Sequence, residues 1–243
     1  MNRLEEYFGK IKQLLERIET TQKEPMEKAA RMGAEVIARG GVIHFFGCGH
    51  SHILCEEVFY RAGGLAPVNP LFAPEVMLHH GAVKHTKMER MEGLAEAILE
   101  NYDTRQGELI FVISTSGRNA VPVEMAIRAR EKGLIVAAVT SLAYSSKTRS
   151  RHSSGKHLYE VADIVIDNCV DFGDALLDYG DLKAVPGSTV AGAAVLNGII
   201  ARIIELLTEE GIDPPVFISG NIDGADERNI KTLKRYKNRI KGF

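Results

Sequence analysis

The feature that most constrains this chain is a repeated alternation of short apolar runs with longer amphipathic stretches, which begins after Gly41. Runs this apolar are typical of parallel strands that are covered on both faces of a sheet. Alternating strands and helices imply right-handed crossovers. We therefore expect an α/β fold, a three-layer α/β/α sandwich with a mostly parallel sheet. The expected strands are 42–46, 109–113, 134–139 and 163–167, with a weaker one at 66–68.

Helical periodicity defines the rest of the chain. Apolar residues at helical spacing predict a helix over 3–20, and Pro25 suits the first turn of a second helix that stops at Gly40. These two helices cover the domain's own core or form a subunit contact. We expect a helical N-terminal segment over 1–39, one α/β domain over 40–212 and a helical C-terminal extension over 213–243. Within the domain the expected helices are 51–62, 92–101, 119–132 and 189–210.

Composition and charge exclude several classes of protein. The 243 residues carry 30 Lys and Arg against 32 Asp and Glu, which is not the basic footprint of a nucleic-acid-binding protein. The longest apolar run meets Arg202 before it reaches the length of a membrane span, and the first residues lack the apolar core of a signal peptide. Three cysteines without paired spacing indicate reduced thiols. We expect a cytoplasmic protein with no cofactor, no metal, and no nucleic-acid or membrane partner.

The loop after the first strand reads Gly47-Cys48-Gly49-His50-Ser51 and leads directly into a helix. In such sheets ligands bind beyond the carboxyl ends of the strands. The glycines let the backbone approach a ligand, Ser51 can cap the helix and donate its hydroxyl, and the helix N-terminus attracts an anion. His50 is a candidate ligand contact. The third glycine and the acidic residue of a dinucleotide fingerprint do not fit, so the loop is a weak signal for a nucleotide.

A second loop follows the strand at 109–113 and opens the helix over 119–132. Its consecutive hydroxyls, its glycine and the helix N-terminus offer several neutral donors to one phosphate. The segment Pro186-Gly187-Ser188-Thr189 either closes the same pocket or only caps the long apolar helix. The expected phosphate-binding residues of these two loops are Ser114, Thr115, Ser116, Asn119, Ser188 and Thr189.

Together these motifs resemble the sugar isomerase (SIS) domain. The resemblance is carried by G-x-G-x-S after the first strand, S-T-S-G-R-N after a later one and A-D-I-V-I-D-N at 162–168, and it runs from about residue 30 to 210. It implies that Ser51, Ser114 and Ser116 hold the phosphate of a phosphorylated sugar. SIS domains generally dimerise with their sites near the interface. The resemblance therefore implies a homodimer or homotetramer and favours the contact role of the N-terminal helices.

Two kinds of SIS protein are similar to different parts of the chain. The single-domain layout with leading helices resembles phosphoheptose isomerases, whereas the segment 186–197 resembles N-acetylmuramic acid 6-phosphate etherases. The sequence departs from both: Arg61 stands where the isomerases have a glutamate, the helix over 189–210 lacks their histidine, and the etherase glutamates have no clean match. The leading hypothesis is an aldose–ketose isomerase of a sugar phosphate. The alternatives are an etherase-like lyase and a non-catalytic sugar-phosphate sensor.

An aldose–ketose isomerase needs a base of near-neutral pKa to move a proton between C1 and C2, and a group that shuttles the hydroxyl proton. The expected catalytic residues are Glu57 or Glu56, in the helix that Ser51 opens, and a histidine of the following crossover, His79 or His80. The same crossover also carries Glu75, His85, Glu89 and Glu92. For most of its acids and histidines, the alternative interpretation is that they are charged residues of a solvated loop.

Overall fold

The computed structural model describes residues 2–243 and contains the expected parallel sheet. Its strand order is β2-β1-β3-β4-β5, and every neighbouring pair is parallel. All five strands lie within two residues of the predicted runs. The strands are β1 (Ile43–Gly47), β2 (Val68–Pro70), β3 (Leu109–Ile113), β4 (Ile135–Thr140) and β5 (Ile164–Asp167).

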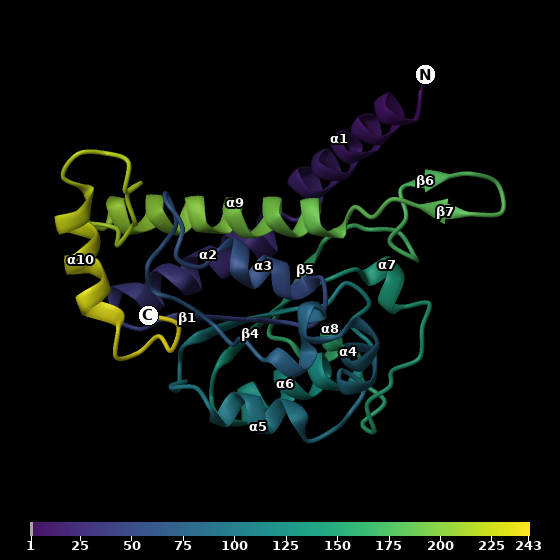
Figure 1. The fold of residues 1–243 in the computed structure, drawn as a ribbon, viewed down its shortest axis with the longest axis horizontal. Helices are drawn as coiled ribbons and strands as arrows, with labels where there is room; N and C mark the ends of the chain where they lie inside the picture. Colours follow the sequence, from purple (N-terminus) through teal and green to yellow (C-terminus); the bar gives the residue numbers. More distant parts are fainter. Residues whose placement is uncertain (1) are drawn as a thin grey trace.

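Helices cover both faces of this sheet, so the three-layer α/β/α prediction is confirmed (Figure 1). Side chains alternate across a strand, and β1 accordingly sends Phe45 into one core and Phe46 into the other. The Phe45 side is covered by α1 (Arg3–Thr21), α2 (Lys23–Ala38), α3 (Ser51–Glu57) and α9 (Ser188–Glu209). The Phe46 side is covered by α5 (Leu94–Glu100), α6 (Ala120–Glu131) and α8 (Leu158–Val161).

Several elements differ from the predictions. The helix expected over 51–62 ends at Glu57, because the chain turns through Tyr60 with a positive φ of 43°. The crossover over 73–91, which lies outside the predicted helices, is partly helical. Its short elements are η1 (Pro74–Val76), η2 (Leu78–His80) and α4 (Ala82–Met88). The remaining elements are α7 (Leu142–Ser145), the hairpin β6 (Leu177–Asp178) with β7 (Lys183–Ala184), and α10 (Ala225–Tyr236).

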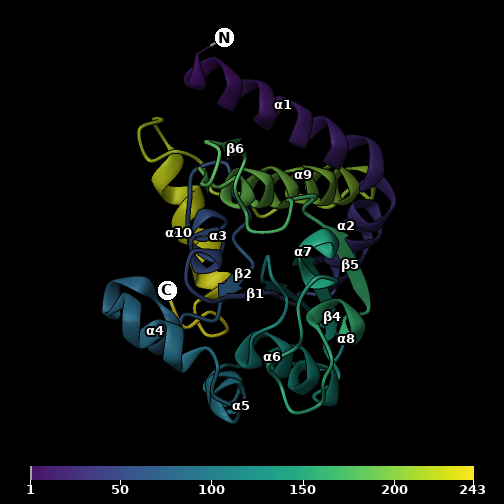
Figure 2. The ribbon, with the colours of Figure 1, turned by 90° about the vertical axis from the view of Figure 1, so that its right-hand side faces the viewer.

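The two N-terminal helices cover the domain's own core. Ala29, Ala30 and Ile37 of α2 are buried in the cluster that α9 completes. The first half of α1 extends beyond the domain (Figure 1, Figure 2). Its Leu4 and Phe8 are exposed. Helix α9 is the one helix among residues 2–243 that is long and apolar enough to cross a bilayer. Half of that apolar stretch is buried inside the domain, as in a core helix.

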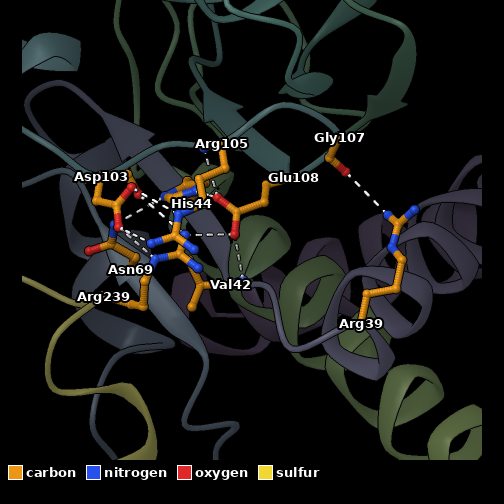
Figure 3. A network of polar contacts seen from close by, with 9 residues as sticks. All are labelled: Arg39, Val42, His44, Asn69, Asp103, Arg105, Gly107, Glu108 and Arg239. Carbon is orange, nitrogen blue, oxygen red and sulfur yellow. Dashed lines mark hydrogen bonds and ion pairs between the residues drawn. The ribbon is translucent and has the colours of Figure 1, made fainter.

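A buried polar network anchors the C-terminal extension at the end of the sheet where β1 and β3 begin (Figure 3). Glu108 accepts hydrogen bonds from His44 Nε2 (2.9 Å), from the Arg239 guanidinium (2.7 Å) and from the Val42 amide (3.0 Å). His44 is fully buried, and its other ring nitrogen accepts a hydrogen bond from the Asn69 side-chain amide. The bond from Arg239 therefore ties the tail that follows α10 to the core strands.

Candidate functional site

The register of the sheet places the two predicted anion loops next to each other. Gly47, the last residue of β1, is paired with Ile113, the last residue of β3. The loops 48–51 and 114–119 therefore leave the same edge of the sheet side by side. Helices α3 and α6 begin at this edge, and both N-termini lie there (Figure 2). This is the edge at which parallel α/β sheets bind ligands.

The hydroxyl groups of the loops divide into two kinds. The Ser114 hydroxyl accepts the Gly117 amide (3.2 Å), and the Thr115 hydroxyl accepts the Asn168 side-chain amide (3.3 Å). No hydrogen bond within residues 2–243 engages the half-buried hydroxyls of Ser51 or Ser116. Ser51 is the first helical residue of α3 rather than its cap, which is His50. The first pair orders the loop, and the second pair is free to donate to a ligand.

The third hydroxyl segment lies toward the same end of the molecule. Gly192 of α9 packs against Leu54 of α3, since an added Cβ would lie 2.3 Å from it. Five residues later, Asn197 of α9 donates a hydrogen bond to Glu57, which is three residues after Leu54. The two helices therefore run in the same direction. The start of α9 is therefore near Ser51. However, the Ser188 hydroxyl donates to the Asp174 carboxylate (2.6 Å), which also accepts the amides of Gly187 and Ser188. An internal carboxylate thus already occupies this helix N-terminus, and no side-chain hydrogen bond involves Thr189 within residues 2–243.

The predicted catalytic residues have contacts with parts of the chain other than the hydroxyl loop 114–119. Glu57 is ion-paired with Arg61 and accepts a hydrogen bond from Asn197. Glu56 is exposed and lies 3.2 Å from the Nδ1 atom of His52. The other two predicted residues, His79 and His80, lie exposed on η2. No hydrogen bond or ion pair among the described residues joins these four side chains to the loop 114–119.

The structure instead brings two other residues of the crossover to the loops. His85, on α4, is buried with its ring against Gly49, where an added Cβ would lie 2.9 Å from Nε2. Its Nε2 lies 3.5 Å from a carboxylate oxygen of Glu89, the residue that follows α4. The other oxygen of Glu89 accepts a hydrogen bond from Asn119 (2.5 Å). A chain of contacts thus runs from the first glycine loop to the second hydroxyl loop.

Sequence reasoning considered His85 and Glu89 but did not select them. The available signal was their spacing of four residues, which places both side chains on one face of a helix. That signal was lost because the seven-residue helix α4 has little apolar periodicity and was expected to be a loop. The sequence also gives no indication that Asn119 would reach Glu89 across thirty positions of the chain.

Comparison with known proteins identifies the family. A family model described as "SIS domain" matches residues 6–141. This chain belongs to the SIS domain family. A UPF0309 protein of Geobacillus kaustophilus is 50% identical over 239 residues, which cover 98% of this chain and 95% of that protein. The family predicted from the loop motifs is therefore confirmed.

Solved structures of SIS proteins share the fold. A phosphoheptose isomerase from Francisella tularensis has a TM-score of 0.58 at 14% identity, over 84% of this chain and 100% of that one. The NanR protein of Vibrio vulnificus, solved in complex with ManNAc-6P, has a TM-score of 0.52 at 12% identity, over 98% of this chain and 69% of that one. At such identities the similarity establishes the SIS fold alone.

Burial shifts the pKa values of the groups at the centre of this SIS site. It raises the pKa of Glu89 above its ordinary value, against the opposing effect of Arg90 and Arg151. Burial also lowers the pKa of His85, and the nearby His50 lowers it further, so the His85 imidazole is neutral near pH 7. The thiol of Cys48 is buried with a strongly raised pKa and stays protonated. A carboxylate whose pKa is raised toward neutrality, beside a neutral imidazole, is suited to proton transfer.

Replacing Gly49 by alanine should damage the site directly. Gly49 has a φ of 59°, and its Cβ would lie 2.8 Å from Cε1 of His85. The methyl group would push His85 away from the loop and strain the backbone, at a cost of about 1–3 kcal/mol. Urea unfolding should show this loss of stability. The matched control is Gly9→Ala, in open space on α1, which should not destabilise the protein.

Proposed function

We propose that the protein binds a phosphorylated sugar at the loops 47–51 and 114–119 and isomerises it between aldose and ketose. The observation that carries this proposal is the position of Glu89, a largely buried carboxylate that accepts a hydrogen bond from Asn119 and lies beside neutral His85. A base for proton transfer is thereby held next to a loop whose free hydroxyl suits a phosphate.

The phosphate would be held by neutral donors. Ser51 and Ser116 offer unengaged hydroxyls, and the amides at the start of the 12-residue helix α6 offer further donors and the positive end of a helix dipole. Ser114 and Thr115 hold the loop in shape through their own hydrogen bonds. Gly47 and Gly49 have no Cβ, which lets the Ser51 backbone and the His85 ring pack directly against the loop, and His50 lies exposed. Ser188 and Thr189 would join this site only if Asp174 released the Ser188 hydroxyl.

Proton transfer would use Glu89 and His85 in place of Glu57 or Glu56 and His79 or His80. Glu89 takes the proton from C2 of the aldose, which gives an enediol, and returns a proton to C1 to give the ketose. His85 Nε2 is buried and has no hydrogen-bond partner among the described residues, so it is available to move the proton between the two sugar oxygens. Both groups stay in place through one turnover, and the enzyme is regenerated unchanged.

We also propose that the protein acts in the cytoplasm as a homodimer or homotetramer. The exposed Leu4 and Phe8 on the extended half of α1 support a subunit contact, which is the second role considered for the N-terminal helices. Leu182 of the hairpin loop is also exposed, and Arg3 of α1 lies over the ring of Tyr179 in the same hairpin. Light scattering on the purified protein measures the oligomeric state.

A thermal-shift screen of phosphosugars against their unphosphorylated counterparts tests the binding proposal. A ligand at 100 times its Kd adds about 2.7 kcal/mol, which raises the Tm of a chain of this size by roughly 5–10 °C. We expect this shift with phosphorylated sugars only, and we expect it to be lost in Ser116→Ala. Ser219→Ala, near the C-terminal helix, should keep the shift. No shift across the panel would contradict the proposal, and a shift without turnover would identify a sensor instead of an isomerase.

A further inference from the structure

Most arginines of this protein are neutralised by a carboxylate, and the exceptions are not evenly spread. Among the described residues, ten of sixteen arginines form an ion pair with Asp or Glu: Arg3, Arg17, Arg31, Arg61, Arg105, Arg128, Arg130, Arg202, Arg228 and Arg239. The six without one are Arg39, Arg90, Arg118, Arg149, Arg151 and Arg235. Four of these six gather beside the loop 114–119, so the arginines without an ion pair are concentrated at the candidate site.

Hydrogen bonds fix the geometry of this group. The Arg118 side chain donates to the carbonyl of Arg149 (3.0 Å), and the carbonyl of Arg118 accepts the amide of Arg151 (2.8 Å). The Arg151 guanidinium donates to Oδ1 of Asn119 (2.7 Å). The Nδ2 group of the same Asn119 side chain donates to Glu89. Arg90 follows Glu89 in the chain. We call Arg90, Arg118 and Arg151 the arginine corner.

No carboxylate among the described residues forms an ion pair with the arginine corner. The segment 145–157 contributes Lys147, Arg149, Arg151 and Lys156 and contains no acidic residue. Glu92, the next acid after Glu89, is engaged by the amide and hydroxyl of Ser153. Burial lowers the pKa of Arg151, the charges of Arg118 and Arg90 lower it further, and the Glu89 carboxylate opposes this shift. Like charges held together in this way favour the binding of an anion.

We propose that the arginine corner binds a second anionic group of the sugar phosphate. The inference rests on the proposed function, in which neutral hydroxyls and amides hold the phosphate and leave the guanidinium groups unused. Arginine presents paired donors that match the oxygens of a carboxylate or a phosphate. The preferred substrate is therefore a phosphosugar that also carries a carboxylate or a second phosphate. Asn119 stands between Glu89 and Arg151 and sets the spacing between the reacting carbons and this second group.

Titration calorimetry with matched ligand pairs tests this inference. Glucose 6-phosphate is compared with 6-phosphogluconate, and fructose 6-phosphate with fructose 1,6-bisphosphate, so that the carboxylate and the second phosphate are measured separately. We expect the member with two anionic groups to bind about 10-fold more tightly or better in at least one pair, a difference of about 1.4 kcal/mol. The Arg118→Gln/Arg151→Gln double variant should lose this preference and keep its affinity for the monophosphates.

The controls separate the inference from the function on which it rests. Compared with the double variant, Arg151→Lys should keep part of the preference for the ligand with two anionic groups, because lysine retains the positive charge at this position. Arg39→Gln, which removes an unpaired arginine next to Gly107 at the other end of the sheet, should keep the full preference. Equal affinities within both pairs would overturn the inference and leave the proposed function intact, as would an equal loss for both members of a pair in the double variant. If no phosphosugar bound to the protein, the proposed function would fail and the inference with it.

Discussion

Replacing Glu89 by glutamine is expected to lower the kcat for isomerisation by about 10²–10⁴-fold, the usual contribution of a general base. Glutamine has the same shape and can still accept the hydrogen bond from Asn119. The loop and its phosphosugar affinity should therefore be retained, and the loss should appear in kcat rather than in binding. The measurement is steady-state kinetics on the phosphosugar that gives the largest thermal shift, together with the Kd of the variant.

The matched control is Glu57→Gln. Glu57 occupies the helix that Ser51 opens, but its contacts are with Arg61 and Asn197, so its replacement should change kcat by less than about 3-fold. The reverse pattern, an inactive Glu57→Gln and an active Glu89→Gln, would contradict our assignment of the base.

The pH profile of the native protein's activity gives a second readout of the same residue. The base must be ionised to accept a proton, and burial holds the pKa of Glu89 above its ordinary value of 4.5. We therefore expect kcat/KM to fall as the pH is lowered through this raised pKa, and the acid limb of the profile to lie above pH 4.5. An acid limb below that value would argue against Glu89.

Replacing Glu108 by glutamine is expected to cause the largest loss of stability. The Glu108 carboxylate accepts hydrogen bonds from His44, Arg239 and two backbone amides. The amide group of a glutamine would face donors with a donor and would leave the Arg239 charge without its partner in the core. Breaking such a buried pair costs about 3–5 kcal/mol, which lowers the Tm of a chain of this size by roughly 6–20 °C. Urea unfolding and calorimetry measure the loss.

Two further observations check this account of Glu108. Amide exchange should rise in the tail after α10, because Arg239 loses its buried partner and keeps only its ion pair with the more exposed Asp103. The exposed pair Arg128–Glu131 supplies the control, since Glu131→Gln should cost less than about 1 kcal/mol. A Glu108→Gln protein as stable as this control would contradict the role of the network.

The same contacts determine how Glu108 affects stability at low pH. They lower its pKa from 4.5 to about 2. A carboxyl group with a depressed pKa stabilises the fold above its unfolded pKa, and that contribution is lost as the pH falls from about 4.5 to about 2. Between these values the native protein should lose more stability than Glu108→Gln, and the two unfolding free energies should converge.

The architecture was predictable because its signals are local. Runs such as 109–113 are apolar without interruption, and a strand buried on both faces requires this. The hydroxyl loops were predictable for a related reason, since they follow such strands directly and open helices. Ser51, Ser116 and Asn119 therefore lie at the predicted edge of the sheet.

The proposed acid–base pair was not predictable because it depends on contacts between distant parts of the chain. Whether His85 is buried depends on Gly49 lying against its ring, and the environment of Glu89 depends on Asn119 and Arg151. His79 and His80 resemble His85 in sequence context, but they lie on exposed η2. The role of Asp174 at the start of α9 was not predictable for the same reason. The amides that donate to its carboxylate, those of Gly187 and Ser188, lie thirteen and fourteen positions away in the chain.

The most direct test of the central claim is solvent exchange followed by NMR. The protein is incubated in D₂O with the phosphosugar that it binds most tightly, and the proton at C2 of the aldose is observed. If the protein is an isomerase that uses Glu89, deuterium should enter the carbon that accepts the transferred proton, and exchange should be lost in Glu89→Gln. Binding without any exchange in the native protein, or full exchange in the variant, would contradict this assignment.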